Sequence, residues 1–579
     1  MKITTPWGEK LDKNNPLPEY PRPQFERDSF ISLNGVWSYL ITKENVDKPL
    51  KFDGDIVVPF APESQLSGVG RVVLPDDHLF YERTFDLPES FILGRVLLNF
   101  GAVDYLSKVY INNVFVGEHR GGYNPFSFDI TDYIVIGKNL IMIAVTDPSD
   151  SGCQARGKQT IGGKGIWYTP SSGIWQTVWL ESVPLVHLEK IKITPDIDNS
   201  AVSIRVFANA QPKRAEIIIF DGDEVVSKAD YIIGEDKTIS LPQQKLWSPE
   251  NPHLYDVVVA CDDDLVRSYF GQRKFSIDKD KNGRMRMFLN NKAYFHNGLL
   301  DQGYWCDGMY TAPSDEAMIY DIKLAKDLGF NMLRKHIKIE PFRWYYHCDR
   351  LGIIVWQDMI NGGSRYKLLR ISALPFLGAK CDDTNYKKLF RESEDGRAEF
   401  ISDYTEMLSN LYNVVSIGVW VIFNEAWGQF DSVKITALTK KLDNTRVIDS
   451  TSGWYDQGGG DVKSIHCYFV PFKLPKAEKR AILLSEFGGY SYQEKGHTFT
   501  NKVFGYRVYN EKTKLNEGYK KLFEKQIIPA VAKGLSASVY TQLSDVESEI
   551  NGLVTYDRRV VKFDKKLLVS LNSQLKIKD

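Results

Sequence analysis

Apolar and polar residues alternate in short segments through the first third of the chain. Residues 108–111 and 139–145 each show this period of two, and turn-forming residues such as Asn112 and Asn113 stand between them. Such alternation is typical of strands that bury one face, and a series of them between turns indicates a β-sandwich. We therefore predict an N-terminal β-sandwich over residues 1–183, with a long Gly- and Ser-rich loop at 150–173.

A second run of alternating segments follows the first. Residues 190–193, 202–206 and 215–220 again place apolar side chains at every other position. Their number and spacing suit a small immunoglobulin-like sandwich of about seven strands. Residues 184–276 are predicted to form this second domain.

The pattern changes near residue 290, where short apolar runs begin to alternate with helical periods. Helices are predicted at 313–328, 386–412 and 515–532. The predicted strands lie at 293–298, 331–334, 353–357, 417–423, 446–449, 464–467, 481–485 and 537–541. Eight strands with helices between them predict a TIM (β/α)8 barrel over 277–579. A doubly wound sheet is the alternative, but it needs a glycine-rich loop after its first strand, and residues 295–298 offer none.

The charge balance and the composition limit the kinds of binding partner that this chain can have. Lys and Arg number 73 and Asp and Glu number 74, so the chain has no basic excess for nucleic acid or a membrane surface. No apolar stretch approaches the length of a membrane span, and the first residues lack the apolar core of a secretory signal. We expect a cytoplasmic protein, or a periplasmic or secreted one if a signal was removed.

Two predicted barrel strands run directly into a glutamate. Residues 417–424 lead to Glu425, and residues 481–485 lead to Glu486. Chemistry in a TIM barrel occurs where strands end at the C-terminal face, and glycoside hydrolysis needs two carboxyl groups there. The alternative is that each glutamate pairs with an arginine in a structural ion network.

Short runs in all three segments match those of one known family. They are YPRP at 20–23, LNGVW at 33–37, YERTF at 81–85, SGIWQTV at 172–178, LWSPENPHLY at 246–255, FGQR at 270–273, NMLR at 331–334, CDRLG at 348–352, NE at 424–425 and SEFG at 485–488. In this order and spacing they resemble glycoside hydrolase family two, the group of β-galactosidases, β-glucuronidases and β-mannosidases. The resemblance covers nearly the whole chain.

The resemblance implies a jelly-roll sugar-binding domain, an immunoglobulin-like domain and a catalytic barrel. It also implies a retaining exo-glycosidase, which hydrolyses terminal non-reducing sugars by double displacement. Glu425 would be the general acid/base and Glu486 the nucleophile, and Asn424 would hydrogen-bond the sugar 2-hydroxyl. The substrate would be an oligosaccharide or glycoside.

Further residues are expected around these three. Arg334 matches the barrel arginine of the family, and Tyr468 resembles the tyrosine that hydrogen-bonds the nucleophile. His336 lies two residues after Arg334, where the family pattern has a histidine three residues after it. Asp358 closes the third predicted strand. Further substrate-binding candidates follow the first and last strands: Asp301, Gln302, Trp305 and Tyr540.

Departures from the family pattern decide the expected sugar. No lysine stands two residues after Asn551, so a glucuronide is the least expected substrate. The Glu-x-His metal motif is absent after Asp358, so no metal and no cofactor are expected. A β-galactoside is the first expectation, and arabinosides, glucosides, mannosides and fucosides stay open.

Two other classes of protein are weighed against an enzyme of this kind. A non-catalytic carbohydrate-binding protein would share the scaffold, but both glutamates are present. A metal-dependent barrel hydrolase would need clustered histidines, and no HxH or HExxH occurs. The oligomeric state is left open, a homo-oligomer included, as is whether the 150–173 loop caps the site or is simply exposed.

Overall fold

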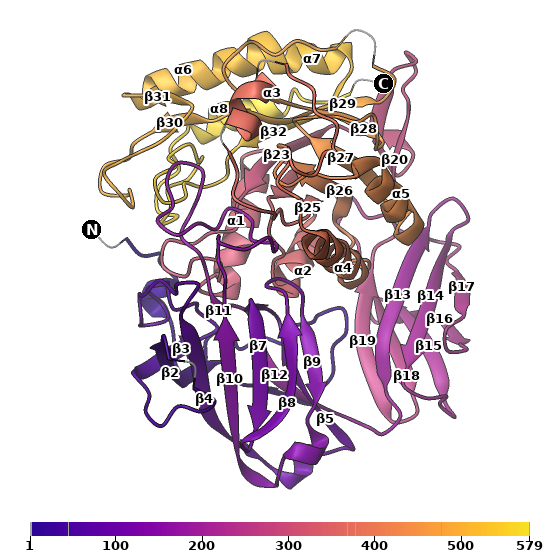
Figure 1. Cartoon of the computed structure of the whole chain (residues 1–579). Coiled ribbons are helices and arrows are strands. Elements are labelled where there is room, and N and C mark those ends of the chain that lie inside the picture. The colour runs from indigo at the N-terminus through magenta and orange to yellow at the C-terminus, as the bar shows by residue number, and fades with distance from the viewer. Residues whose placement is uncertain (1–2, 45, 368, 377, 476–477, 578–579) are drawn as a thin grey trace.

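Burial along the first strands follows directly from the alternating sequence. In β10 (Gly137–Thr146), Ile141, Ile143 and Val145 are buried in the core between two sheets, and the residues between them are less enclosed or face the other side. The computed structural model, which describes residues 3–44, 46–367, 369–376, 378–475 and 478–577, shows one hydrophobic core in each of the two sandwiches and further cores in the barrel domain. The predicted fold class, two β-sandwiches followed by a TIM barrel, is confirmed (Figure 1).

The first sandwich consists of a six-stranded and a four-stranded antiparallel sheet. The larger sheet has the order β3 (Gly54–Val58), β2 (Gly35–Thr42), β4 (His78–Leu87), β10, β7 (Leu106–Ile111) and β8 (Val114–Arg120). The smaller sheet has the order β1 (Phe30–Ser32), β12 (Val178–Val183), β5 (Arg95–Phe100) and β9 (Phe126–Asp129). A short antiparallel pair joins β6 (Val103–Asp104) to β11 (Gly173–Ile174), and β11 begins where the long 150–173 loop ends.

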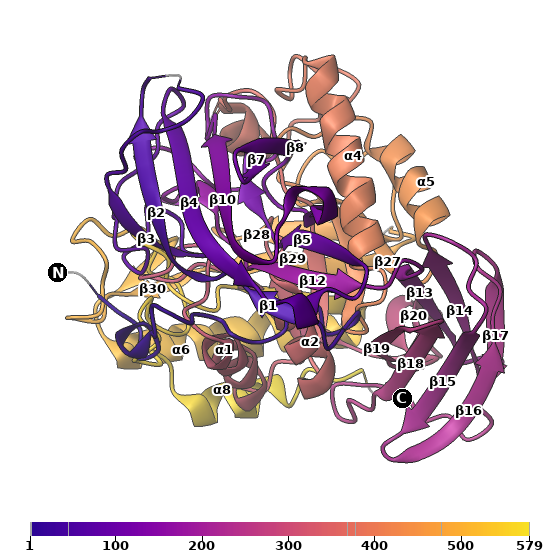
Figure 2. The same cartoon turned by 90° about the horizontal axis from the view of Figure 1, so that it is seen from below.

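The second sandwich packs a three-stranded sheet against a four-stranded sheet. The first sheet has the order β13 (Leu188–Asp196), β14 (Ala201–Ala208) and β17 (Asp236–Ser240). The second has the order β16 (Glu224–Asp230), β15 (Ala215–Asp221), β18 (Tyr255–Cys261) and β19 (Asp264–Phe270). Figure 2 shows the two sandwiches side by side, at one end of the barrel domain.

The barrel is an eight-stranded parallel sheet whose end strands, β27 and β28, lie side by side. Its strands are β23 (His296–Asp301), β24 (Met332–Lys335), β25 (Ile354–Asp358), β26 (Ile417–Asn424), β27 (Val447–Ser452), β28 (Val462–Cys467), β29 (Ala481–Gly488) and β32 (Leu535–Thr541). Helices on the outside include α1 (Asp315–Asp327), α2 (Phe342–Leu351), α4 (Glu394–Asn410), α5 (Ser432–Leu442), α6 (Lys512–Leu522), α7 (Ile528–Lys533) and α8 (Lys565–Asn572). All eight predicted strands overlap observed ones.

Two differences occur where the second sandwich meets the barrel. The domain boundary predicted at 276/277 falls inside β20 (Phe275–Lys279), which pairs with β21 (Met285–Leu289) beneath the barrel. The first barrel strand begins at His296 rather than at 293, because residues 292–293 form β22, which pairs with β21. β20 and β22 have the same apolar pattern as the strands next to them, so periodicity alone does not distinguish them from those strands. The other predicted domain limits stay predictions.

No helix among the described residues is both long and apolar enough to cross a membrane.

Candidate active site

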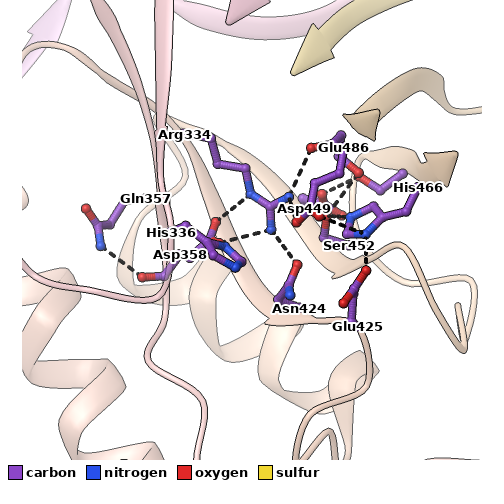
Figure 3. Close-up of polar contacts among 12 residues, drawn as sticks. Arg334, His336, Gln357, Asp358, Asn424, Glu425, Asp449, Ser452, His466 and Glu486 are labelled. Carbon is purple, nitrogen blue, oxygen red and sulfur yellow. Dashed lines mark hydrogen bonds and ion pairs between the residues drawn. The ribbon is translucent and has the colours of Figure 1, made fainter. Parts of the chain in front are cut away.

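The carboxyl ends of the barrel strands bring Glu486 and Arg334 into contact. Arg334, at the end of β24, is fully buried and donates from Nη1 to Oε1 of Glu486 at 3.1 Å. It also makes a two-pronged pair with Asp358 at the end of β25, where both N–O distances are 3.0 Å. A planar guanidinium holds two carboxylates in fixed directions, so this arrangement orients Glu486 (Figure 3).

Arg334 also fixes Asn424, which ends β26. Its Nη2 donates to Oδ1 of Asn424 at 2.8 Å. The other amide atom, Nδ2 of Asn424, is buried and has no hydrogen-bond partner among the described residues. A buried donor without an acceptor is costly, so Nδ2 is available for a bound ligand.

Glu425 is presented by a strained turn directly after β26. Both Glu425 and Ala426 have positive φ angles, 47° and 60°. Residues other than glycine seldom occupy this left-handed region of backbone conformation. The amide of Glu425 donates to the carbonyl of Ser452 at 2.9 Å, which ties the turn to β27. Backbone strain of this kind concentrates where a side chain must be held in a particular direction.

His466 lies between the two glutamates. Its Nδ1 is 2.8 Å from Oε1 of Glu425 and 3.5 Å from Oε2 of Glu486 (Figure 3). Its Nε2 is 3.0 Å from the hydroxyl of Ser452, and that hydroxyl donates to Ser485. Because the Ser452 hydrogen is already used, Nε2 donates to Ser452 and Nδ1 shares a proton with Glu425.

Tyr468 completes the surroundings of Glu486 from the end of β28. Its hydroxyl donates to Oε2 of Glu486 at 2.5 Å, and its ring stacks on Tyr506 with centroids 4.0 Å apart. Glu486 therefore receives hydrogen bonds on both carboxylate oxygens. His336, after β24, contacts Asp358 at 2.7 Å and so supports the Arg334 network from the side.

The surroundings drive the two glutamates toward different protonation states. Burial raises the pKa of Glu425, and the negative charge of Glu486 raises it further. Burial acts on Glu486 in the same sense, but His466 and Arg334 outweigh it and bring the pKa of Glu486 below its ordinary value. One carboxyl group therefore keeps its proton while its neighbour ionises, the division of roles that an acid and a nucleophile require.

The same three groups are close enough to contact one metal ion. One ligand atom each from Glu425, His466 and Glu486 lies within 4.8 Å of the other two. Each of these atoms already has a hydrogen-bonding or ion-pair partner inside the site, and a cation there would occupy both glutamates.

Four predicted substrate residues lie elsewhere. Asp301 is in a buried ion network with Lys335, and Gln302 donates to Gln542. The guanidinium carbon of Arg558 lies over the ring of Trp305, 4.3 Å from the ring centroid. These three corrections share a reason: each side chain is buried and already engaged by a neighbouring side chain, instead of standing free to meet a ligand.

Tyr540 is the fourth correction. It is fully buried, its hydroxyl accepts from the amide of Tyr490, and its ring packs on Tyr519 of α6 and on Phe563. Alternate residues of a barrel strand face opposite sides, and Tyr540 faces the helices. It therefore does not form an aromatic floor for a ligand.

His466 was not predicted as a site residue from the sequence. The signal was present: His466 stands two residues before Tyr468 at the end of one strand, so period-two alternation directs both side chains the same way. No comparable signal pointed to Lys158, which lies in the 150–173 loop of the first sandwich and contacts the ring of Trp427 in the barrel.

The long loop of the first sandwich crosses to the barrel mouth. The guanidinium of Arg156 donates to the carbonyl of Gly363, after β25. The ring of Trp167 lies 5.0 Å from that of Trp427, two residues after Glu425. Figure 1 shows this purple segment rising from the sandwich to the barrel. The 150–173 loop is therefore packed on the barrel rather than simply exposed, and that it caps the site stays a prediction.

Models of one family match three consecutive parts of the chain. The sugar binding domain of glycosyl hydrolases family 2 matches residues 30–184, a second model of the same family matches 186–273, and its TIM barrel domain matches 283–504. Together these matches span most of the chain and follow the order of the three observed domains.

Individual relatives are more distant. A putative β-glucuronidase of Formosa agariphila is 28% identical over 444 residues, which is 68% of this chain and 48% of that protein. A β-galactosidase of Thermoanaerobacter pseudethanolicus is 23% identical over 510 residues, covering 82% of this chain and 63% of that protein. The matched part of the chain thus spans 48% of the length of the first of these curated relatives and 63% of the second.

Solved structures share the whole architecture. A β-glucuronidase from an uncultured Clostridium superposes with a TM-score of 0.74 at 17% sequence identity. The superposition covers 95% of this chain and 99% of that one. At this identity the likeness establishes the fold.

Proposed function

The chain belongs to glycosyl hydrolase family 2 and is a glycoside hydrolase, and from that premise we propose that it is a retaining exo-glycosidase with Glu486 as nucleophile and Glu425 as acid/base. One observation carries the proposal: a carboxylate oxygen of Glu425 and one of Glu486 lie no more than 4.8 Å apart. Retaining enzymes hold their two carboxyl groups about 5–5.5 Å apart, whereas inverting enzymes leave about 6.5–9.5 Å for a water molecule.

The first step forms a covalent intermediate. A carboxylate oxygen of Glu486 attacks the anomeric carbon while the proton of Glu425 passes to the leaving oxygen, and the glycosidic bond breaks. Arg334 and Tyr468 keep Glu486 ionised and directed at that carbon. The free Nδ2 of Asn424 donates to the sugar 2-hydroxyl, a contact that strengthens as positive charge develops on the ring.

The second step releases the sugar with its original configuration. Glu425, now ionised, takes a proton from water, and the hydroxide equivalent attacks the anomeric carbon and displaces Glu486. His466 shares a proton with Glu425 in both halves of the cycle, and so holds its carboxyl group in place while its charge changes.

A β-galactoside remains the first sugar expected from the sequence, and relatives bear both β-galactosidase and β-glucuronidase names. The residues that bear on the reaction, around Glu425 and Glu486, do not by themselves decide between these sugars.

Stereochemistry tests the proposal. Initial products from a panel of nitrophenyl α- and β-glycosides, followed by proton NMR, should have the anomeric configuration of the substrate. Glu486→Gln should lower kcat at least about 10,000-fold. Glu486→Gly with azide should give a glycosyl azide of opposite configuration. An initial product of inverted configuration from the wild-type protein would exclude the covalent mechanism.

A further inference from the structure

The 150–173 loop carries a buried lysine to the barrel mouth. Lys158 is 5% exposed, and its Nζ lies 5.5 Å from the ring centroid of Tyr168 and 5.8 Å from that of Trp427. Within the described parts of the chain, no hydrogen bond or ion pair engages this ammonium group. An ammonium group with so little access to water is costly to leave uncompensated, and the two rings compensate it only in part, so a ligand that supplies an anionic acceptor would bind favourably beside it.

The charge of Lys158 acts on three titratable groups at the ends of barrel strands. Burial is the main influence on the pKa values of Glu425, His336 and Glu549, and Lys158 is among the charges that lower all three. These groups follow β26, β24 and β32, on different sides of the barrel. The contact with the ring of Trp427, two residues after Glu425, agrees with this and places the ammonium group near the catalytic carboxyl groups.

Glu549 does not neutralise the lysine by direct contact. Its two oxygens accept from Tyr168 and from Asn551, and no ion pair joins it to Lys158. Glu425 and Glu486 are committed to His466, Arg334 and Tyr468. These three glutamates are therefore held by donors other than the lysine.

A second donor stands in the same wall of the site. Trp427 is 2% exposed, and its indole Nε1 is buried without an acceptor among the described residues. It follows Glu425 by two positions and has Lys158 over its ring. An ammonium group over the ring and the indole N–H of that ring, both without acceptors among the described residues, suit a ligand group that is anionic and rich in oxygen.

We propose that Lys158 recognises a carboxylate on the terminal sugar, so that the substrates of this enzyme are hexuronides. This inference rests on the proposed function and adds the class of sugar to it. A neutral hexose would offer the lysine only a hydroxyl, which compensates a buried charge less well than a carboxylate does. The recognising residue comes from the first sandwich, so the barrel alone does not hold the complete site.

The test compares matched substrates. Rates of hydrolysis are measured for nitrophenyl glucuronides and galacturonides, in both anomers, beside the corresponding glucosides and galactosides. The expected result is a kcat/KM at least about 100-fold higher for one uronide than for its neutral counterpart. In Lys158→Met that preference ratio should fall at least about 30-fold. Lys164→Met, which removes an exposed lysine of the same loop, should leave the ratio unchanged.

A binding measurement guards against a misfolded variant. Calorimetric titration of Glu486→Gln with free glucuronate, galacturonate, glucose and galactose should show preference for a uronate. Lys158→Arg, which keeps the charge, should retain more of that preference than Lys158→Met. Equal binding of acid and neutral sugars would overturn the inference.

The outcomes separate this inference from the proposed function. If neutral glycosides are the best substrates and Glu486→Gln abolishes their hydrolysis, the reaction stands and uronide recognition is wrong. If a uronide is preferred but Lys158→Met keeps the preference, another group reads the carboxylate and the assignment of Lys158 is wrong. If no glycoside of either class is hydrolysed, the proposed function fails and this inference fails with it.

Discussion

Nδ1 of His466 lies 2.8 Å from Oε1 of Glu425, so the acid/base proposed here has a proton-sharing partner inside the barrel. The same nitrogen lies 3.5 Å from Glu486, which makes this imidazole a link between the two carboxyl groups. Its other nitrogen is fixed by Ser452 of the neighbouring strand.

Replacing His466 should shift the whole pH profile. His466 lowers the pKa of both Glu425 and Glu486, so in His466→Ala both values should rise. The acid limb of kcat/KM follows ionisation of Glu486 and the alkaline limb follows deprotonation of Glu425, so both limbs should move to higher pH. We also expect kcat/KM at the pH optimum to fall on the order of 100-fold, because Glu425 is less well placed without His466. A lower activity with unmoved limbs would assign His466 a purely structural role.

Arg334 should matter for both activity and folding. Arg334→Met removes the cation that holds Glu486 and leaves Asp358 buried without its two-pronged partner. Breaking a buried pair in this way costs about 3–5 kcal/mol, so the thermal midpoint should fall by several degrees. Activity should fall more than 100-fold even at temperatures where the variant is folded. Arg205→Met, which breaks an exposed pair with Asp236, is the control and should change neither quantity appreciably.

Glu63 should make the first sandwich sensitive to high pH. It is buried, it accepts from the amides of Val73 and Ser172, and burial raises its pKa to about 8. Because the folded value exceeds the unfolded one, the stabilising contribution is complete below about pH 4.5 and is lost as pH rises through 8. As pH rises from 5 to 9, the free energy of unfolding of Glu63→Gln should therefore increase relative to that of the wild type, by several kcal/mol at most. The exposed Glu89→Gln should show no such trend, and a parallel pair of curves for Glu63→Gln would refute this reading.

The clamp made by Arg156 should be needed for activity more than for stability. Arg156→Ala removes the hydrogen bond to the carbonyl of Gly363 that holds the 150–173 loop on the barrel. We expect kcat/KM to fall about 10-fold or more, because a loop that positions substrate loses its anchor. The thermal midpoint should change by only a few degrees, since both sandwich cores stay intact. Unchanged kinetics on an oligosaccharide would show that the loop does not act on the substrate.

The sequence alone was sufficient for the architecture. Period-two segments predicted both sandwiches, and the change to alternating strand and helix patterns predicted the barrel with all eight strands. It also identified Glu425 and Glu486, because a strand that runs straight into a glutamate is unusual in a buried sheet. These features are local, so a single stretch of residues contains all the information that specifies them.

What only the tertiary structure decided is which distant residues meet. Asp301 and Tyr540 stand at the ends of barrel strands, yet the register and twist of the barrel turn them into a buried ion pair and into the helix layer. His466 acquires its place from the closing of β27 against β28, and Lys158 arrives from a loop more than two hundred residues before Glu425. Such pairings depend on how whole domains pack, and no periodicity along the chain records them.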